Sequence, residues 1–199
     1  MIKEKIKNKL FNLFEDYLKR KNKLELNILK NNFKYIGSNF KLLKDFTVKN
    51  PQYMEIGDNF SALERFRIEA WDKYGQKVFA PSIKIGNNVI FNTDIHIGCI
   101  NSIIIGNNCL FGSRIYITDH HHGEPSTEML KLPPKDRPLV SKGSVIIKNN
   151  VWVGEGVAIM PNVTIGENSI VATNAVVTKD VPPNCVVAGI PAVIIKYIN

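Results

Sequence analysis

Aliphatic residues recur at every sixth position through the second half of the chain. One series occupies positions 145, 151, 157, 163, 175 and 181, and a second occupies positions 147, 153, 159, 165, 171 and 177. An α-helix would repeat its apolar face every three to four residues, and a half-buried strand every two. A period of six is typical of the short strands of a parallel β-helix, whose stacked coils share one core.

The second series continues toward the N-terminus in the same phase. Three six-residue repeats, here called hexads, close one coil. The residue after each inward one must be small where the chain turns, as at Gly154, Gly166 and Ala172. The pattern predicts an all-β protein with a parallel β-helix of about six coils over residues 36–182. The inward positions of the earlier coils are Ile36, Leu42, Val48, Ile56, Ala62, Ile68, Ile85, Phe91, Ile97, Ile105, Phe111 and Ile117.

Every break in the period follows the third hexad of a coil. Steps of eight separate Val48 from Ile56 and Ile97 from Ile105, and steps of 17 and 30 follow Ile68 and Ile117. Because neighbouring coils lie about 4.8 Å apart, these insertions should lie above one another along one edge and wall a cleft. The longest is predicted as a protruding external loop over residues 119–144, and long loops on a regular scaffold are usually functional.

The two ends of the chain lie outside the repeat. Residues 1–35 carry apolar residues at helical spacing, at positions 2, 6, 10, 13, 14, 17 and 18, with lysines between them. This segment has no uninterrupted apolar core, so it is expected to be neither a secretory signal nor a membrane span. It predicts an amphipathic helix that caps the open end of the β-helix, or alternatively a basic helix on an anionic membrane surface. Residues 183–199 are predicted as a C-terminal tail.

Composition indicates which partners the protein binds and in which cellular compartment it is expected. The 199 residues carry a net charge of +8, which favours an acidic partner such as a phosphate-bearing cofactor, an anionic glycan or lipid head groups. The lysines do not form a stripe with aromatic residues, so no nucleic-acid partner is expected. Three cysteines without a CxxC motif indicate reduced thiols and a cytoplasmic location.

Residues 117–143 concentrate the candidate chemistry, since they hold three of the four histidines and four of the ten prolines. His120 lies where the chain leaves the regular coils of the predicted β-helix, and an imidazole there can act as a general base near neutral pH. Asp119 or Glu124 could fix its tautomer. A run of surface histidines without a task is the plain alternative. The histidines are adjacent in one loop, with only His96 elsewhere, so no metal site is predicted.

Several motifs carry a family resemblance. "NNVWVG", "VTKDVPPN" and "AGIPA" occur together in residues 146–199, and "IGNNVIFNTDIHIG" and "IGNNCLFGSRIYITDHHHG" extend the match to residues 83–199. The chain resembles the hexapeptide-repeat acyltransferases, in particular the galactoside and maltose O-acetyltransferases and the sugar O-acetyltransferases of bacterial O-antigen and capsule synthesis. The resemblance implies a left-handed β-helix and a homotrimer with active sites between subunits.

The resemblance also implies roles for individual residues. In this family a histidine at the loop edge removes the proton of a sugar hydroxyl as the hydroxyl attacks acetyl-CoA, without an acyl-enzyme intermediate. His120 matches that position best and His122 is the second choice. Trp152 matches a tryptophan beside the pantetheine and the catalytic histidine. Asn92 matches an acceptor-binding asparagine, and Asp94 and Asn101 are further candidates.

The resemblance places coenzyme A along the C-terminal coils. The implied contacts are Gly154, Glu155, Ala172, Thr173, Thr178, Lys179 and Lys196. The chain departs from the family at two points. Residues 172–175 read "ATNA" instead of "GAGS", and Val193 replaces the usual arginine, which leaves Lys196 as the cation for the phosphates.

Together these features predict an acetyl-CoA-dependent O-acetyltransferase for a sugar of a surface polysaccharide or its lipid-linked precursor. The basic N-terminal helix would suit an enzyme at the inner face of the membrane. N-acetylation of an amino sugar and acetylation of an antibiotic are the alternative enzyme functions. A non-catalytic scaffold and a metal-dependent hydratase are the alternatives from other classes.

Overall fold

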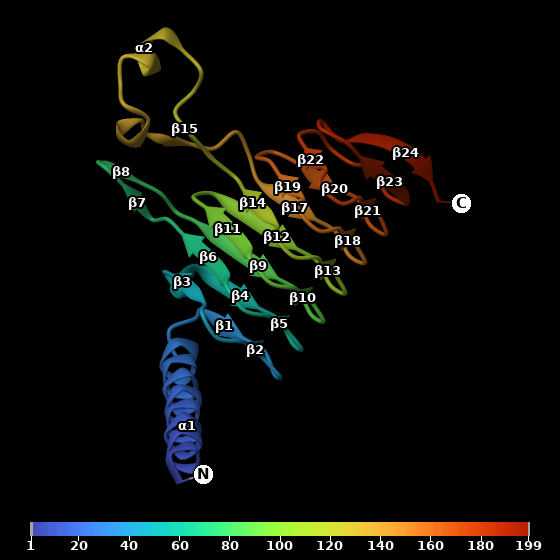
Figure 1. Cartoon of the computed structure of the whole chain (residues 1–199). Coiled ribbons are helices and arrows are strands. Elements are labelled where there is room, and N and C mark those ends of the chain that lie inside the picture. Colours follow the sequence, from blue (N-terminus) through green and yellow to red (C-terminus); the bar gives the residue numbers. More distant parts are fainter. Residues whose placement is uncertain (1, 199) are drawn as a thin grey trace.

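Three parallel sheets form a triangular prism in this computed structural model, which describes residues 2–198 (Figure 1). Sheet A contains β1 (Tyr35–Ile36), β4 (Met54–Ile56), β9 (Ser82–Ile85), β12 (Ser102–Ile105), β17 (Val145–Ile147) and β20 (Thr164–Ile165). Sheet B contains β2 (Lys41–Leu42), β5 (Ser61–Ala62), β10 (Ile90–Phe91), β13 (Leu110–Phe111), β18 (Trp152–Val153), β21 (Ile170–Val171), β23 (Cys185–Ala188) and β24 (Val193–Tyr197). Sheet C contains β3 (Thr47–Lys49), β6 (Phe66–Ala70), β11 (Ile95–Cys99), β14 (Tyr116–Thr118), β19 (Ala158–Ile159) and β22 (Val176–Val177).

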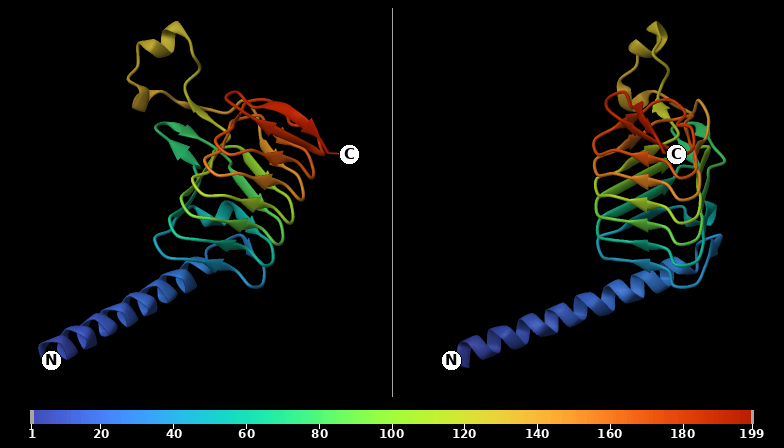
Figure 2. Two further views of the ribbon diagram at one scale, coloured as in Figure 1. Left: turned by 45° about the vertical axis from the view of Figure 1, so that its right-hand side comes forward. Right: turned by 90° about the vertical axis from the view of Figure 1, so that its right-hand side faces the viewer.

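The order of the strands reproduces the six-residue period. The chain passes through sheets A, B and C in the same order six times, and each strand pairs in parallel with its counterparts in the adjacent passes. Figure 2 shows these passes stacked as successive layers of one column. The predicted parallel-strand hexapeptide architecture is therefore confirmed. The segment predicted as a tail contributes two strands, because β23 extends sheet B in parallel and β24 pairs with it antiparallel.

The inward residues form one continuous core. Ile85, Ile105 and Ile147 share one register in sheet A, and all three are buried. Phe91 and Phe111 occupy the same level of sheet B and stack with their ring centroids 4.3 Å apart. Of the predicted inward residues, Ile36 and Val48 at the N-terminal end are half-buried and the others are buried.

An asparagine ladder closes the edge between sheets A and B. Its members adopt a left-handed backbone conformation, which asparagine tolerates better than most residues. Each side-chain amide donates to the asparagine of the next coil, over distances of 2.8–3.2 Å. The ladder consists of Asn39, Asn59, Asn88, Asn108, Asn150, Asn168 and Asn184.

The long insertions leave the prism at the edge between sheets C and A. One is a hairpin of β7 (Lys73–Tyr74) and β8 (Lys77–Val78). The other runs from β14 to β17 and contains β15 (His121–His122), α2 (Thr127–Leu130), η2 (Pro134–Asp136) and β16 (Leu139–Val140). A short 3-10 turn, η1 (Pro51–Tyr53), lies between β3 and β4 at this edge. Figure 1 shows the hairpin and the long loop on the same side of the prism, and the Tyr74 hydroxyl donates to the Lys135 carbonyl over 2.6 Å.

Helix α1 (Ile2–Lys30) touches the prism only through its C-terminal half. Leu26, Leu29 and Phe33, which follows the helix, pack against the core at the open end of the first coil. Residues 3–14 are all exposed, and the helix leaves the column sideways in Figure 2. The part of the predicted cap that covers the core is therefore the end of the helix and the turn that follows it.

We expect the stacked phenylalanines to dominate local stability. Phe91→Ala should lower the free energy of unfolding by about 3–5 kcal/mol, because it removes a fully buried ring and leaves a cavity. Val78→Ala, at an exposed position of the β7–β8 hairpin, is the control and should cost less than about 0.5 kcal/mol. Urea unfolding of the three proteins checks this, and equal stabilities would contradict the assigned core.

Candidate active site

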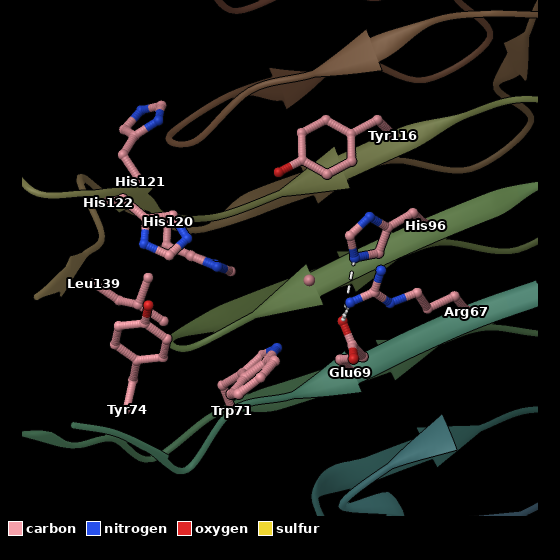
Figure 3. Close-up of a pocket in the computed structure, with 11 residues that line it drawn as sticks. Arg67, Glu69, Trp71, Tyr74, His96, Tyr116, His120, His121, His122 and Leu139 are labelled. Carbon is pink, nitrogen blue, oxygen red and sulfur yellow. Dashed lines mark hydrogen bonds and ion pairs between the residues drawn. The ribbon is translucent and has the colours of Figure 1, made fainter. Parts of the chain in front are cut away.

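A pocket of about 210 Å³ opens beside the edge between sheets C and A. One wall is the outer face of sheet C, and the other is formed by the two insertions. Figure 3 shows the histidines of the long loop on one side and Arg67, Glu69 and His96 on the other. The lining residues are Arg67, Glu69, Trp71, Tyr74, His96, Gly98, Tyr116, His120, His121, His122 and Leu139.

The register of sheet C assembles the first wall. Arg67, His96 and Tyr116 occupy the same level of β6, β11 and β14, each one residue before an inward isoleucine. Side chains alternate between the faces of a strand, so these three project outward side by side. The rings of His96 and Tyr116 are 5.2 Å apart.

His120 is oriented by the residue that precedes it. Its Nδ1 lies 2.9 Å from Oδ1 of Asp119, and its side chain is mostly buried. A carboxylate can only accept a hydrogen bond, so Nδ1 carries the proton and Nε2 of the neutral ring keeps its lone pair. Glu124, the other carboxylate that the sequence allowed for this role, forms an ion pair with Lys142 instead.

Asp119 is fully buried and held by several donors. The backbone N–H groups of Ile100 and Asn101 donate to it over 2.9 and 2.8 Å, and the Cys99 thiol lies 3.2 Å from Oδ2. Burial alone would raise the pKa of the Asp119 carboxyl, but hydrogen bonds from His120, these two N–H groups and Cys99 outweigh it and lower that pKa. The carboxylate is therefore charged and fixed at neutral pH.

A second imidazole–carboxylate pair lies across the pocket. Glu69 is almost fully buried, and its Oε2 forms an ion pair with Arg67 over 2.8 Å and lies 3.3 Å from Nε2 of His96. Burial lowers the pKa of His96 most, the nearby Arg67 charge adds to this, and Glu69 only partly opposes it. His96 is therefore neutral at neutral pH.

Gly98 lies between the two imidazoles. A Cβ atom at this position would lie 3.3 Å from Cε1 of His120 and 3.9 Å from Nε2 of His96. The missing side chain therefore leaves the space between the two rings open.

The hairpin completes the pocket from the opposite insertion. The Tyr74 and His122 rings are 5.4 Å apart, edge to face. His122 belongs to β15 and pairs with Leu139, so it is held in a strand. Trp71 follows β6, and Nζ of Lys49 lies 3.0 Å from the centre of its ring.

Within one chain, the structure does not place the predicted acceptor residues together. Asn101 lies near His120, since its backbone holds Asp119 and its amide reaches Ser141 of the long loop over 3.4 Å. Asn92 and Asp94 lie at the edge between sheets B and C, away from this pocket. The Asp94 carboxylate forms a bidentate ion pair with Arg65, whose hydrogen bond lowers the pKa of Asp94.

The predicted coenzyme A contacts lie on three parts of the prism. Gly154, Glu155, Ala172 and Thr173 follow β18 and β21 at the edge between sheets B and C. Thr178 and Lys179 follow β22 at the edge between sheets C and A, and Lys196 lies in β24.

Two of these residues have local constraints. A Cβ on Gly154 would lie 2.7 Å from the backbone nitrogen of Thr173, so only glycine fits there. Glu155 is paired with Arg114 at 2.8 Å. Trp152 lies on the outer face of sheet B and is 52% exposed.

Sequence reasoning missed the wall formed by Arg67, Glu69, Trp71 and Tyr74. The signal was present in the phase of the repeat, because the residues before Ile68, Ile97 and Ile117 must stack outward on one face.

Among residues 2–198 there is no group of three or more His, Cys, Asp or Glu side chains that could hold a metal ion.

Comparison with known proteins places the chain in a family. Residues 144–179 match the bacterial transferase hexapeptide (six repeats) family. The chain is 35% identical over 155 residues to WbbJ of Escherichia coli K12, assigned as a lipopolysaccharide-biosynthesis O-acetyltransferase, and the match covers 76% of each chain. The chain belongs to the hexapeptide-repeat acyltransferases. It is accordingly an acyltransferase.

Two solved structures share the fold. A galactoside acetyltransferase in complex with coenzyme A matches with a TM-score of 0.55 and 28% identity, over 87% of this chain and 69% of that chain. AntD, an N-acyltransferase from Bacillus cereus in complex with dTDP and 3-hydroxybutyryl-CoA, matches with a TM-score of 0.68 over 88% of each chain. At 21% identity, the likeness to AntD shows the fold alone.

The lowered pKa of His96 predicts a pH-dependent stability. The unfolded chain takes up a proton on this residue near pH 6.5, whereas the folded chain does so only at lower pH. Stability is therefore lost as the pH falls below about 6.5. His96→Gln, which keeps an N–H donor for Glu69, should reduce this loss and leave stability above pH 7.5 nearly unchanged. Urea midpoints between pH 8 and 5 measure the effect, and an unchanged slope in the variant would contradict it.

Proposed function

We propose that the protein transfers an acetyl group from acetyl-CoA to a carbohydrate hydroxyl, with His120 as the general base. The observation that carries this proposal is the Asp119–His120 pair at the pocket. Asp119 holds Nδ1, so Nε2 has a free lone pair, and His120 lines the pocket. A sugar hydroxyl has a pKa far above 7 and needs a positioned base to attack a thioester at neutral pH.

The reaction follows from this arrangement. Nε2 of His120 takes the proton from the acceptor hydroxyl while the oxygen attacks the acetyl carbonyl carbon. The carbon–sulfur bond then breaks, and the imidazolium returns the proton to the departing thiolate. Asp119 stabilises the transient positive charge on the ring, and the acetyl group passes directly to the acceptor.

The proposed donor is supported by the family. The similar galactoside acetyltransferase was solved with coenzyme A bound. In this chain Gly154 and Thr173 would lie along the pantetheine arm, and Lys179 and Lys196 would meet the phosphates as point charges.

The proposed acceptor is a sugar of a surface polysaccharide or its precursor. The similarity to WbbJ supports this class. The pocket itself offers aromatic rings from Trp71, Tyr74 and Tyr116 beside hydrogen-bonding groups, a combination that suits a polar ring with apolar faces. An imidazole base would also serve an amine, so a panel of hydroxyl-only and amino sugars distinguishes O-acetylation from N-acetylation.

We further propose a left-handed coil and a homotrimer whose sites lie between subunits. Ile90, Leu110 and Trp152 share one register on the outer face of sheet B, and each is more than 40% exposed. An apolar stripe of this kind is usually covered by a ligand or a second subunit. The trimer would bring Trp152 and Asn92 of one subunit to the His120 pocket of the next.

Removing the proposed base should abolish turnover without unfolding the protein. We expect His120→Ala to lower the rate of thiol release from acetyl-CoA in the presence of acceptor by about 10²- to 10⁴-fold. His122→Ala is the matched variant, and it should lose less than about tenfold because another imidazole acts as the base. The reverse order of the two losses would move the catalytic role to His122.

A shared site predicts complementation between inactive variants. His120→Ala and Trp152→Ala homotrimers should both be weakly active. When the two are unfolded, mixed in equal amounts and refolded, about one quarter of the sites should combine an intact His120 with an intact Trp152 from the neighbour. Recovery of activity on mixing is the expected result. No recovery, with mixed trimers demonstrated by mass, would contradict a site built from two subunits.

A further inference from the structure

Helix α1 carries an apolar stripe whose side chains lie outside the hydrophobic core of the described residues. Every residue of the stripe is more than half exposed. The members are Ile6, Leu10, Leu13, Tyr17, Leu24 and Ile28, spaced at intervals that bring them to one side of the helix. Burying large apolar side chains is favourable, so a stripe of this length is typical of an interaction surface.

The stripe points away from the prism. The half-buried residues Leu18, Leu26 and Leu29 mark the side of α1 that meets the first coil. At 100° per residue, the stripe lies roughly opposite these residues around the helix axis. Figure 2 shows α1 leaving the base of the column sideways, so the stripe looks outward from that end of the molecule.

Basic residues flank the stripe on both sides. Helix α1 contains nine lysine or arginine residues and four acidic ones, which gives +5 of the chain's total of +8. Helical spacing places Lys3, Lys7 and Lys21 along one flank. It places Lys5, Lys9 and Lys23 along the other flank. Of the four acidic residues, Glu4 and Glu15 lie toward the prism-facing side, and one of the other two, Asp16 and Glu25, lies on each flank. Glu25 is 3.7 Å from Lys21, so the lysines outnumber the acidic residues on both flanks without excluding them.

The distribution of apolar and basic residues on α1 favours an anionic bilayer over a second copy of the helix as the partner. An identical helix from a second copy would bring lysine flanks against lysine flanks, which is unfavourable. An anionic bilayer surface complements both features, because acyl chains accept the apolar stripe and lysines reach the charged head groups at its sides. Within residues 2–198 no helix is long and apolar enough to cross a bilayer, so the helix would lie along the surface.

We propose that α1 docks the protein on an anionic lipid bilayer through the stripe formed by Ile6, Leu10, Leu13, Tyr17, Leu24 and Ile28. Docking would turn the base of the prism toward the membrane. The inference rests on α1 alone and is independent of the proposed acetyl transfer.

Vesicle sedimentation with the full-length protein tests the proposal. We expect the protein to bind phosphatidylcholine vesicles that contain about one-third phosphatidylglycerol, and to bind pure phosphatidylcholine much more weakly. Leu10→Gln with Leu13→Gln should weaken binding at least about tenfold, because it removes apolar area without changing charge. Asn8→Gln with Asn12→Gln, in the same part of the helix but outside the stripe, is the matched control and should bind like the wild type.

A charge variant distinguishes the contribution of the flanking lysines to binding from that of the apolar stripe. Replacing Lys5, Lys9 and Lys23 with glutamine should weaken binding to the anionic vesicles by about fivefold for each lysine removed. The replaced residues are all exposed, so each variant should keep its fold, which circular dichroism checks. Absence of wild-type binding, equal binding to neutral vesicles, or unchanged binding by the leucine variant would each overturn the proposal. Dissociation of the oligomer by the leucine variant, without vesicle binding by the wild type, would assign the stripe to a second copy.

Discussion

The register between successive coils is the constraint from which the site follows. Each strand pairs in parallel with the equivalent strand of the next coil. A residue's position within its six-residue repeat therefore determines whether its side chain points into the core or outward. The coil to which it belongs determines its level along the axis of the prism. All long insertions leave at the edge between sheets C and A and come to lie next to one another. Residues as distant in sequence as Arg67 and His122 therefore line one pocket without any irregularity in the core.

Rigidity of the scaffold matters for the chemistry at its edge. His120 emerges from a strand end, and the carboxylate that orients it is anchored by backbone N–H groups of the preceding coil. The two N–H donors lie in the short bend between β11 and β12, and their hydrogen bonds help to keep Asp119 charged although it is buried. A positioned base held this way loses little freedom on substrate binding, which is the advantage of building sites on regular elements.

The sequence was sufficient to predict a parallel-strand coil because the six-residue period is clear in the C-terminal coils and can be followed, more weakly, to the N-terminal ones. The inward residues, the edge from which the insertions emerge and the position of His120 at that edge could all be inferred from phase and spacing. The choice between Asp119 and Glu124 could not, because it depends on where each carboxylate points once the loop is folded. Predicting the Arg67–Glu69–His96 cluster requires β6 to be stacked on β11 across a 17-residue step and the outward residues of both strands to be aligned. Trp152 and Asn92 lie apart from the His120 pocket within one chain. The proposal that they contribute to the same site as His120 requires a neighbouring subunit.

The central claim is that Asp119 holds His120 in the tautomer that can act as a base. Nitrogen-15 NMR of histidine-labelled protein, with His120 assigned by comparison with His120→Ala, reads the protonation of each ring nitrogen directly. In the neutral form of the ring, the hydrogen bond to Asp119 predicts protonation at Nδ1 and a free Nε2, with a loss of this tautomer preference in Asp119→Asn. A ring protonated at Nε2 in the wild type, or an identical spectrum in Asp119→Asn, would contradict the account.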